Sequence, residues 1–478
     1  MTEPVDGILA NDFDLVLRDV SVPAAALVAP GPAPERAPRG LLQRLDVGVR
    51  AGRIAALERG LPRGAEEVAG AGALLLPGFV DNHVHYREPG ADAKEGYVTG
   101  SAASARGGAT TIGEIQNNRP LVTTASQWRA KVVSVEARSR VRVLAYGCAV
   151  AGNLREVREL ARVAPGVKLF MAGDPDLEVS ELSALRAVFT EVAAADGLLV
   201  LHAEHGPTVR EGLKRFGERA VDFSRARSAE AERVAVEQSI ELCAATGARI
   251  HLFHVSSAAA CDAIRAAKAR DLPVSAAACA HYLLFTDSDV AARGALLKCN
   301  PSIKSADDRV ALRAAVRDGV LDVIQSDHAP HPREEKERAF GLAPSGIPGA
   351  DLFLPLWLAL VDEGVLDLDQ LVARGALGPA RLHRLDDRGR IGVGALADLV
   401  LIEEKAWTVA EEDFASKAKL SPYVGRTFRR RPAQVWVGGK LVFDRARSED
   451  LAALERAAPP PLQALGAGGG GPASSVCC

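Results

Sequence analysis

The sequence predicts an α/β fold, a (β/α)8 barrel of the TIM type with a small β-sandwich domain built from N- and C-terminal segments. Through the middle of the chain, short apolar runs alternate with helical stretches rich in Ala, Arg and Glu, at intervals of about 25 to 50 residues. These runs supply the eight strands that close such a barrel. Short alternating stretches broken by Pro and Gly occur near both ends of the chain, which is typical of a β domain.

Residues 1–76 are predicted to form the N-terminal part of the small β domain. Alternating apolar and polar residues predict strands at 13–20, 45–49 and 53–57. Between the first two of these, residues from about 23 to 40 are rich in Pro and Ala, and we predict an insertion there.

Residues 77–385 are predicted to form the barrel. Its first strand begins just ahead of that boundary, in an apolar run that ends in two histidines. The candidate strands are residues 74–80, 110–115, 141–146, 166–170, 198–201, 249–253, 273–277 and 321–324. Enzymes with this fold build their sites at the C-terminal ends of these strands, so the residues that follow each run are the first candidates for function.

Residues 386–447 are predicted to complete the small β domain. Strands are expected at 397–402 and 433–443, and Gly438-Gly439 inside the second segment is a hairpin turn signal. The remaining residues, 448–478, contain a run of four glycines and predict a disordered tail.

Composition narrows the classes of function. The 478 residues carry 58 basic and 61 acidic side chains and a formal net charge of −3, so nothing favours binding to nucleic acid or to an anionic membrane, and a small-molecule substrate is expected. Cysteine occurs seven times and forms no C-x-x-C pair, which favours a reducing compartment. No apolar run reaches the roughly 18 residues of a membrane span, and the N-terminus lacks a signal-peptide pattern, so we predict a cytoplasmic protein.

Ionisable residues recur where the predicted barrel strands end. His83 and His85 are two apart at the end of the first strand, so their side chains point the same way and can converge on a divalent metal. A lone His beside a strand is more often a core or surface residue than a metal ligand. Several histidines at the same end of a barrel favour the ligand role instead. The full set is His83, His85, Lys168, His202, His254 and Asp327.

Two of these residues have specific alternatives. Lys168 lies in an apolar run, where an ammonium group needs an ion-pair partner; alternatively, the amine takes up CO2 as a carbamate that bridges two metals. Asp327 follows Ser326, so it could serve as a helix cap, but a carboxylate at a strand end can also bind metal and carry a proton.

The chain resembles the dihydroorotases of the amidohydrolase superfamily from about Asp14 to Asp444. Residues 78–90, with His83-Val-His85 and Arg87-Glu-Pro-Gly90, look like the first signature of that family. Residues 298–304 followed by Asp308-Arg309 resemble its region after the seventh strand, and Asp327-His-Ala-Pro-His331 matches another of its motifs.

The resemblance implies a binuclear metal site. Carried over by position, His83, His85 and Asp327 hold one metal, His202 and His254 hold the second, and carboxylated Lys168 bridges them. Zinc is usual in the family, although Co or Mn suits the same ligands. The implied nucleophile is a bridging hydroxide, and Asp327 is the implied catalytic acid and base. Relatives carry an acidic residue where Ala277 stands, so a third metal is not expected, and other branches have Asp in place of Lys168.

The resemblance also implies a set of substrate contacts. Arg87 would bind the ring carboxylate of dihydroorotate through its planar fork, whereas a surface salt bridge is the simpler alternative. The other positions that match substrate-binding residues are Asn117, Asn300, His331, Ser345 and Gly346.

The implied reaction is the reversible cyclisation of N-carbamoyl-L-aspartate to dihydroorotate and water, in de novo pyrimidine synthesis. Allantoinase and dihydropyrimidinase or hydantoinase-type enzymes are the nearest alternatives, and Arg87 argues against them because their rings carry no carboxylate. A non-catalytic scaffold for aspartate carbamoyltransferase is a further alternative, disfavoured because all six ligand positions are filled. A homo-oligomer is expected, and association with aspartate carbamoyltransferase stays open.

Overall fold

The computed structural model describes residues 13–28, 40–115 and 118–447. The predicted tail, most of the predicted insertion and Asn117 lie outside the described residues.

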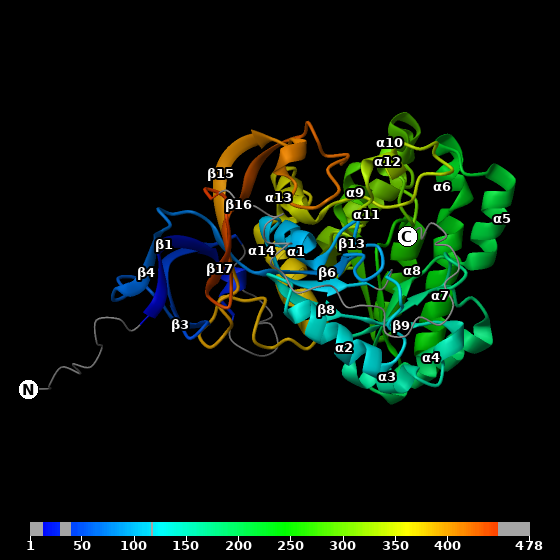
Figure 1. Cartoon of the computed structure of the whole chain (residues 1–478), viewed down its shortest axis with the longest axis horizontal. Helices are drawn as coiled ribbons and strands as arrows, with labels where there is room; N and C mark the ends of the chain where they lie inside the picture. The colour runs from blue at the N-terminus through cyan, green and yellow to red at the C-terminus, as the bar shows by residue number, and fades with distance from the viewer. Residues whose placement is uncertain (1–12, 29–39, 116–117, 448–478) are drawn as a thin grey trace, which may run out of the picture.

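A barrel of parallel strands occupies the middle of the chain (Figure 1). Its strands are β6 (Phe79–Val84), β7 (Ala109–Glu114), β8 (Arg142–Ala145), β9 (Gly147–Ala149), β10 (Val167–Phe170), β11 (Leu198–His202), β12 (Arg249–Leu252), β13 (Val274–Cys279) and β14 (Val323–Gln325). They form a three-stranded sheet in the order β6-β7-β8 and a six-stranded sheet in the order β14-β13-β12-β11-β10-β9. Only Tyr146 separates β8 from β9, so these two occupy one position, and a parallel bridge from Val84 to His328 brings β14 back to β6. The described strands therefore fill the eight positions of a TIM-type barrel, as predicted.

Helices connect successive strands and cover the outside of the barrel. The longer ones are α1 (Tyr97–Arg106), α2 (Ala125–Glu136), α3 (Val157–Val163), α4 (Leu182–Ala194), α5 (Gly206–Phe216), α7 (Ala229–Thr246), α8 (Ala258–Ala269), α10 (Asp287–Arg293), α11 (Ala306–Asp318) and α13 (Phe353–Asp362). Shorter helices are α6 (Phe223–Ala226), α9 (Ala280–Leu284), α12 (Arg333–Lys336), α14 (Leu368–Val372) and α15 (Gly378–Leu382). The sequence sets several of their ends: α11 begins at a capping box of Ser305 and Asp308 and stops at Gly319, whose φ of +82° suits glycine.

Two four-stranded sheets form a β domain beside the barrel (Figure 1). The first has the order β3-β2-β1-β4, with β1 (Phe13–Pro23), β2 (Leu42–Arg50), β3 (Arg53–Glu58) and β4 (Gly64–Ala69). The second has the order β17-β16-β15-β5, with β5 (Leu75–Pro77), β15 (Leu399–Thr408), β16 (Thr427–Val437) and β17 (Lys440–Asp444). Because β5 pairs with β15, both ends of the chain contribute to one sheet, as the sequence predicted.

The predicted first barrel strand, residues 74–80, is in fact two strands. β5 pairs antiparallel with β15 in the β domain, and β6 then begins the barrel. Gly78 separates them, and its amide donates to the Asp398 carbonyl (2.7 Å). A Cβ at this position would lie 2.2 Å from Thr110 Oγ1, so only glycine allows the chain to pass between the two domains here.

The predicted insertion begins later than residue 23. Pro23 is the last residue of β1 and pairs with Leu42, and a 3-10 turn over Ala24–Ala26 follows it. The strand thus extends to the first residue of the Pro- and Ala-rich stretch.

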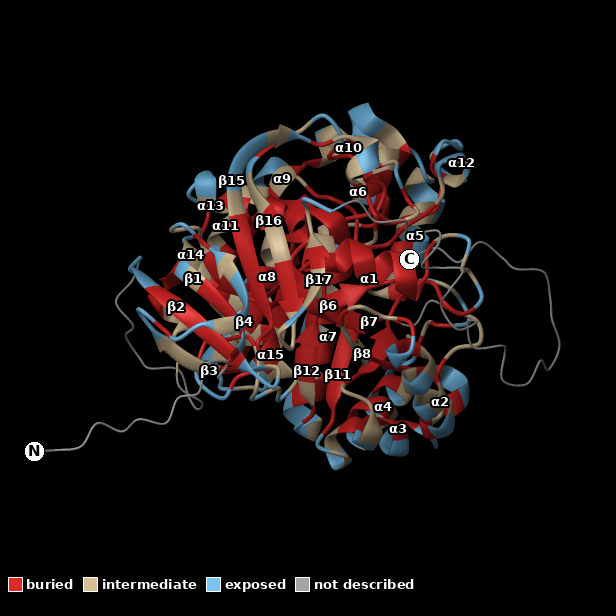
Figure 2. Ribbon diagram, turned by 60° about the vertical axis from the view of Figure 1, so that its left-hand side comes forward, coloured by how far each residue is buried: buried red, intermediate tan, exposed pale blue. Residues whose placement is uncertain are grey.

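The barrel strands are almost entirely buried (Figure 2). All four residues of β10 and all five of β11 are buried, and one apolar cluster continues from the barrel into the β domain. In the described part of the chain, no helix is both long and apolar enough to cross a membrane. Polar side chains inside this interior therefore stand out, and they gather at one end of the barrel.

Candidate active site

Three predicted ligands meet at the junction of β6 and β14. His83 and His85 come from the end of β6, and their Nε2 atoms lie 3.1 Å apart. Asp327 follows β14, and its Oδ1 lies 3.3 Å from His83 Nε2 and 3.5 Å from His85 Nε2. Ligands about 2.1 Å from a tetrahedral ion are about 3.4 Å from each other, so these three atoms fit a single metal.

A second pair of predicted ligands lies beside the first group. His202 ends β11 and His254 follows β12, and His202 Nδ1 lies 3.2 Å from His254 Nε2. The rings of His83 and His254 are 5.2 Å apart between centroids, so the pair is next to the first group. This spacing suits a second ion that shares the space at the barrel end.

Lys168 on β10 points into the same space. Its side chain is fully buried, and Nζ lies 4.4 Å from the ring centroid of Phe253 and 4.6 Å from that of Phe170. The Lys168 charge lowers the pKa of His83, His202 and His254 alike, so it is close to both groups of ligands. Lys168 therefore lies near both groups of predicted ligands.

The protonation of the histidines favours metal binding. Burial is the main cause that lowers the pKa of His83, His202 and His254, and neutral imidazole is the form that binds a metal. Burial raises the pKa of Asp327, but His83, His85 and His254 oppose it, and the net pKa lies well below its usual range. The donor set therefore consists of neutral imidazoles and an anionic carboxylate, which suits divalent ions such as zinc.

Two residues orient the ligand imidazoles. Glu204 Oε2 accepts a hydrogen bond from His202 Nε2 (2.8 Å), which leaves the Nδ1 lone pair directed towards His254. Arg227 in turn pairs with Glu204. The side-chain amide of Gln325 lies 3.0 Å from His83 Nδ1, and an amide turned by 180° would offer its oxygen to a protonated Nδ1.

Three residues at this end of the barrel have a left-handed backbone conformation. Arg87, His254 and Asp327 have φ angles of +62°, +38° and +51°, in the region that residues other than Gly rarely adopt. Such conformations cost of order 1–3 kcal/mol each and persist where the surrounding structure enforces them, often at functional sites. The three residues lie in the segments that follow β6, β12 and β14.

A further possible metal group shares Asp327 with the first. Ligand atoms of Cys279, His281 and Asp327 lie within 4.8 Å of one another. Burial raises the pKa of Cys279 well above its usual value, which opposes the thiolate that a metal requires.

Four of the predicted substrate-binding residues form a connected chain next to the ligands. The Arg87 guanidinium, 2% exposed, donates from Nη2 to His331 Nε2 (3.2 Å), and His331 Nε2 lies 3.0 Å from the Ser345 carbonyl. Ser345 Oγ donates to Asn300 Oδ1 (3.1 Å). Gly346 has a φ of +147°, and a Cβ there would lie 2.4 Å from the Ala329 carbonyl and 2.9 Å from the His331 ring. The structure thus brings these residues together. Because Arg87 is buried, it does not form the surface salt bridge considered above.

Loops hold this chain of residues through contacts that the sequence did not reveal. Glu88 pairs with Arg138 (2.9 Å) and accepts from the Tyr97 amide (3.0 Å), which fixes the residue next to Arg87. Lys336 Nζ donates to the carbonyls of Pro344 (3.0 Å) and Gly346 (2.9 Å), which fixes the loop on the other side. A His-x-Glu spacing could have pointed to Glu204, but no local pattern indicated these two contacts.

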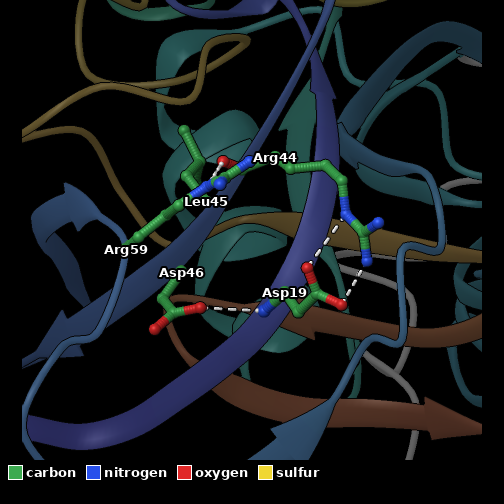
Figure 3. A pocket seen from close by; sticks show the side chains of 5 residues that line it. All are labelled: Asp19, Arg44, Leu45, Asp46 and Arg59. Atoms are coloured by element: carbon green, nitrogen blue, oxygen red, sulfur yellow. Dashed lines mark hydrogen bonds and ion pairs between the residues drawn. The ribbon is translucent and has the colours of Figure 1, made fainter.

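A pocket on the β domain is separate from this site. It is lined by Asp19, Arg44, Leu45, Asp46 and Arg59 (Figure 3). Arg44 Nε donates to Asp19 Oδ1 (2.9 Å), and Asp46 Oδ1 accepts from the Asp19 amide (2.8 Å). Its charged groups thus bind one another and stabilise the first sheet.

Comparisons with known proteins identify the family of the chain. The model of the amidohydrolase family matches residues 74–442. A dihydroorotase of Geotalea daltonii is 35% identical over 411 residues, covering 84% of this chain and 96% of that protein. A dihydroorotase of Trichlorobacter lovleyi is 36% identical over 414 residues, with 85% and 96% covered.

Solved structures share the fold. An L-hydantoinase (dihydropyrimidinase) from Arthrobacter aurescens superposes with a TM-score of 0.84 at 26% identity, covering 91% of this chain and 96% of that one. A dihydropyrimidinase from Brevibacillus agri has a TM-score of 0.78 at 22% identity, with 90% and 95% covered, and supports the fold alone. The chain belongs to the amidohydrolase family, among its metal-dependent cyclic amidohydrolases.

Proposed function

We propose that this protein is a dihydroorotase, which interconverts N-carbamoyl-L-aspartate with dihydroorotate and water. The observation that carries the proposal is the buried Arg87 guanidinium, two residues after His85 and 3.2 Å from His331 Nε2. A dihydroorotate carboxylate fits a bidentate guanidinium, and His331 lies where it can add a further hydrogen bond. The dihydroorotases of Geotalea daltonii and Trichlorobacter lovleyi support the same reaction.

The structural likeness to hydantoinases makes Arg87 the discriminating residue. Hydantoin and dihydrouracil rings carry no carboxylate for the planar guanidinium of Arg87 to bind. A carboxylate on the ring can form the bidentate contact with Arg87, so this residue favours an anionic ring over a neutral one.

The proposed metal ligands are His83, His85 and Asp327 for one ion and His202 and His254 for the other, with Lys168 carboxylated between them. When bound, two divalent ions, zinc in our proposal, supply a nucleophile from water at neutral pH and polarise the amide carbonyl. The chain's own part is to keep the imidazoles neutral through burial and to hold His202 through Glu204.

Asp327 is the proposed catalytic acid and base. In ring opening, its carboxylate accepts the proton of the attacking water and delivers it to the departing ring nitrogen. The left-handed backbone at Asp327 and the contacts of Oδ1 with His83 and His85 fix the carboxylate at the reacting end of the site. Arg87 and His331 meanwhile hold the ring by its carboxylate, and Asn300, Ser345 and Gly346 line the same side.

The biological setting follows from this reaction. We place the protein in de novo pyrimidine synthesis in the cytoplasm, as a homo-oligomer, with aspartate carbamoyltransferase as a candidate partner. The non-catalytic scaffold remains the alternative of another class, and the complete set of buried ligands argues against it.

An activity panel with metal analysis on the same sample tests the proposal. The purified protein is incubated with zinc and bicarbonate and assayed on dihydroorotate, allantoin and dihydrouracil. We expect about two metal ions per chain and a clear preference for dihydroorotate. Preference for a neutral ring would contradict the dihydroorotase assignment, and absence of bound metal together with absence of turnover would favour the scaffold.

A further inference from the structure

His331 has a donor and an acceptor at each of its two ring nitrogens. Nδ1 lies 3.2 Å from Lys94 Nζ, which can only donate, and 3.0 Å from Glu335 Oε2, which can only accept. Nε2 lies 3.2 Å from Arg87 Nη2, a donor, and 3.0 Å from the Ser345 carbonyl, an acceptor. The surroundings thus fit either tautomer of the ring.

A neutral imidazole satisfies only one of these arrangements at a time, because it has a single N–H. Burial, helped by the charges of Arg87, Lys94 and Lys336, outweighs the Glu335 hydrogen bond and lowers the pKa of His331 to about 3, so the ring is neutral at physiological pH. With the proton on Nδ1, the ring donates to Glu335 and accepts from Arg87. With the proton on Nε2, it donates towards Ser345 and accepts from Lys94.

The two tautomers differ in what they present to a bound carboxylate. The anion would lie against Arg87 and Nε2, so an unprotonated Nε2 would direct its lone pair at a negative charge. A protonated Nε2 would instead donate a hydrogen bond to it, and such charge-assisted bonds are among the stronger ones in proteins. Substrate binding therefore requires the proton on Nε2 and a hydrogen-bond donor that faces the unprotonated Nδ1.

From this geometry we propose that Lys94 and Glu335 are positioning residues that set the tautomer of His331, with Lys94 holding the form that binds the substrate carboxylate. This inference rests on the proposed dihydroorotase function. Glu335 stabilises the tautomer of the empty site, and the anion shifts the ring to the form that accepts from Lys94, with the ring protons exchanging through water.

Lys94 is well placed for this role. It lies on the same loop as Arg87, where the Ala91 amide donates to the Arg87 carbonyl (3.0 Å) and the Lys94 amide donates to the Ala91 carbonyl (2.9 Å). Its Nζ also donates to Glu335 Oε2 (2.8 Å), and Glu335 lies on α12, one helical turn after His331. The ammonium and the carboxylate therefore reach Nδ1 side by side, as an ion pair between the loop after β6 and the segment after β14.

The first test combines kinetics with the tautomer itself. In Lys94→Met, the remaining Glu335 keeps the proton on Nδ1, so we expect KM for dihydroorotate to rise by about tenfold or more, as for the loss of one hydrogen bond to a charged group. The value of kcat should change by less than about threefold, because the lost interaction is present in both the ground state and the transition state. ¹⁵N-histidine spectra of the zinc enzyme report the tautomer, and the His331 signals are those that are missing from the spectrum of His331→Gln. Addition of orotate should move the ring proton to Nε2 in the wild type but not in Lys94→Met.

Two double variants separate this role from simple loss of an ion pair. Lys94→Met with Glu335→Gln restores a donor to Nδ1, because the amide N–H can take the place of the ammonium. Lys94→Met with Glu335→Met removes the same charges and restores no donor. We expect KM to return to within about threefold of wild type only in the Gln variant. Lys405→Met, at an exposed position of the β domain, controls for the change in net charge.

The outcomes distinguish this inference from the proposed function. A wild-type enzyme that turns over dihydroorotate, combined with an unchanged KM in Lys94→Met or equal recovery in both double variants, would overturn the tautomer role alone. A wild-type enzyme that prefers a neutral ring would overturn the proposed function and this inference with it.

Discussion

The proposed metal-binding half of the site and its proposed carboxylate-binding half are built in different ways. The proposed metal ligands lie at the ends of barrel strands, on β6, β10 and β11 or just after β6, β12 and β14. The carboxylate half lies on loops, where Arg87, His331 and Ser345 are held by hydrogen bonds to one another. Parallel strands impose the first arrangement, whereas contacts between loops far apart in the sequence impose the second.

The two halves also differ in charge. Burial keeps the histidines of the metal half neutral, so Asp327 supplies an anionic ligand and bound ions would supply the positive charge. The carboxylate half carries permanent charges, and Lys94 and Glu335 in it form an ion pair at 2.8 Å. A change in the first half should therefore affect metal content and chemistry, and a change in the second should affect substrate affinity.

Asp327→Asn should have the largest effect, because this residue belongs to the metal half and also carries the proton. The amide binds a metal poorly and cannot accept the proton of water, so we expect kcat to fall by about 10³-fold or more. Single-turnover kinetics on dihydroorotate, with metal content measured on the same sample, checks this. Near-normal turnover by the variant would remove Asp327 from its proposed role.

Arg87→Lys tests the carboxylate half by keeping the charge and removing the planar fork. Lysine cannot form the bidentate contact, so we expect kcat/KM for dihydroorotate to fall by about 10²-fold, mainly through KM. Metal content should stay at the wild-type level because no ligand has changed. If metal were lost together with affinity, the two halves would not be separable as we describe them.

Glu204→Gln and Glu335→Gln form a matched pair across the comparison, since each replaces a carboxylate that contacts a site histidine. Glu204 orients His202, and loss of such a partner typically lowers metal affinity by about 10- to 100-fold. Glu335 contacts His331, so its replacement should leave metal affinity unchanged. Competition with a chelator measures both, and equal losses of metal in the two variants would contradict the division.

The same division explains which features the sequence could predict. Apolar runs with histidines at their ends indicated both the barrel and the positions of His83, His202 and His254, because strand geometry relates spacing directly to direction. The single strand expected at residues 74–80 was wrong, since an apolar run does not show that Gly78 lets the chain cross from one sheet to another.

The support of the carboxylate half could not be read in this way. Lys94 and Glu335 are 241 residues apart, and each alone looks like an ordinary surface charge. His331 was identified only through the family resemblance, and no spacing rule connects its loop with the loop that carries Arg87, which follows a different strand. Asn117 lies outside the described residues, so its predicted role stays a prediction.

The smallest effect on activity is expected in the β domain, at Asp46. Burial raises the pKa of this carboxyl, but hydrogen bonds from the Asp19 amide, the Arg18 side chain and the amides of Leu61 and Gly60 outweigh it, and the pKa is lowered. A carboxyl group whose pKa is lowered by folding stabilises the protein at a pH above the pKa that the group has in the unfolded chain. This contribution is lost as the pH falls through the pKa that the group has in the folded protein.

Asp46→Asn should therefore reduce the free energy of unfolding by about 1–2 kcal/mol at pH 7, with kcat and KM unchanged. Denaturant unfolding of both proteins from pH 7 to pH 3 checks the sign, because the difference between them should shrink below about pH 4. A difference that grows on acidification would show that Asp46 does not stabilise the first sheet as an anion.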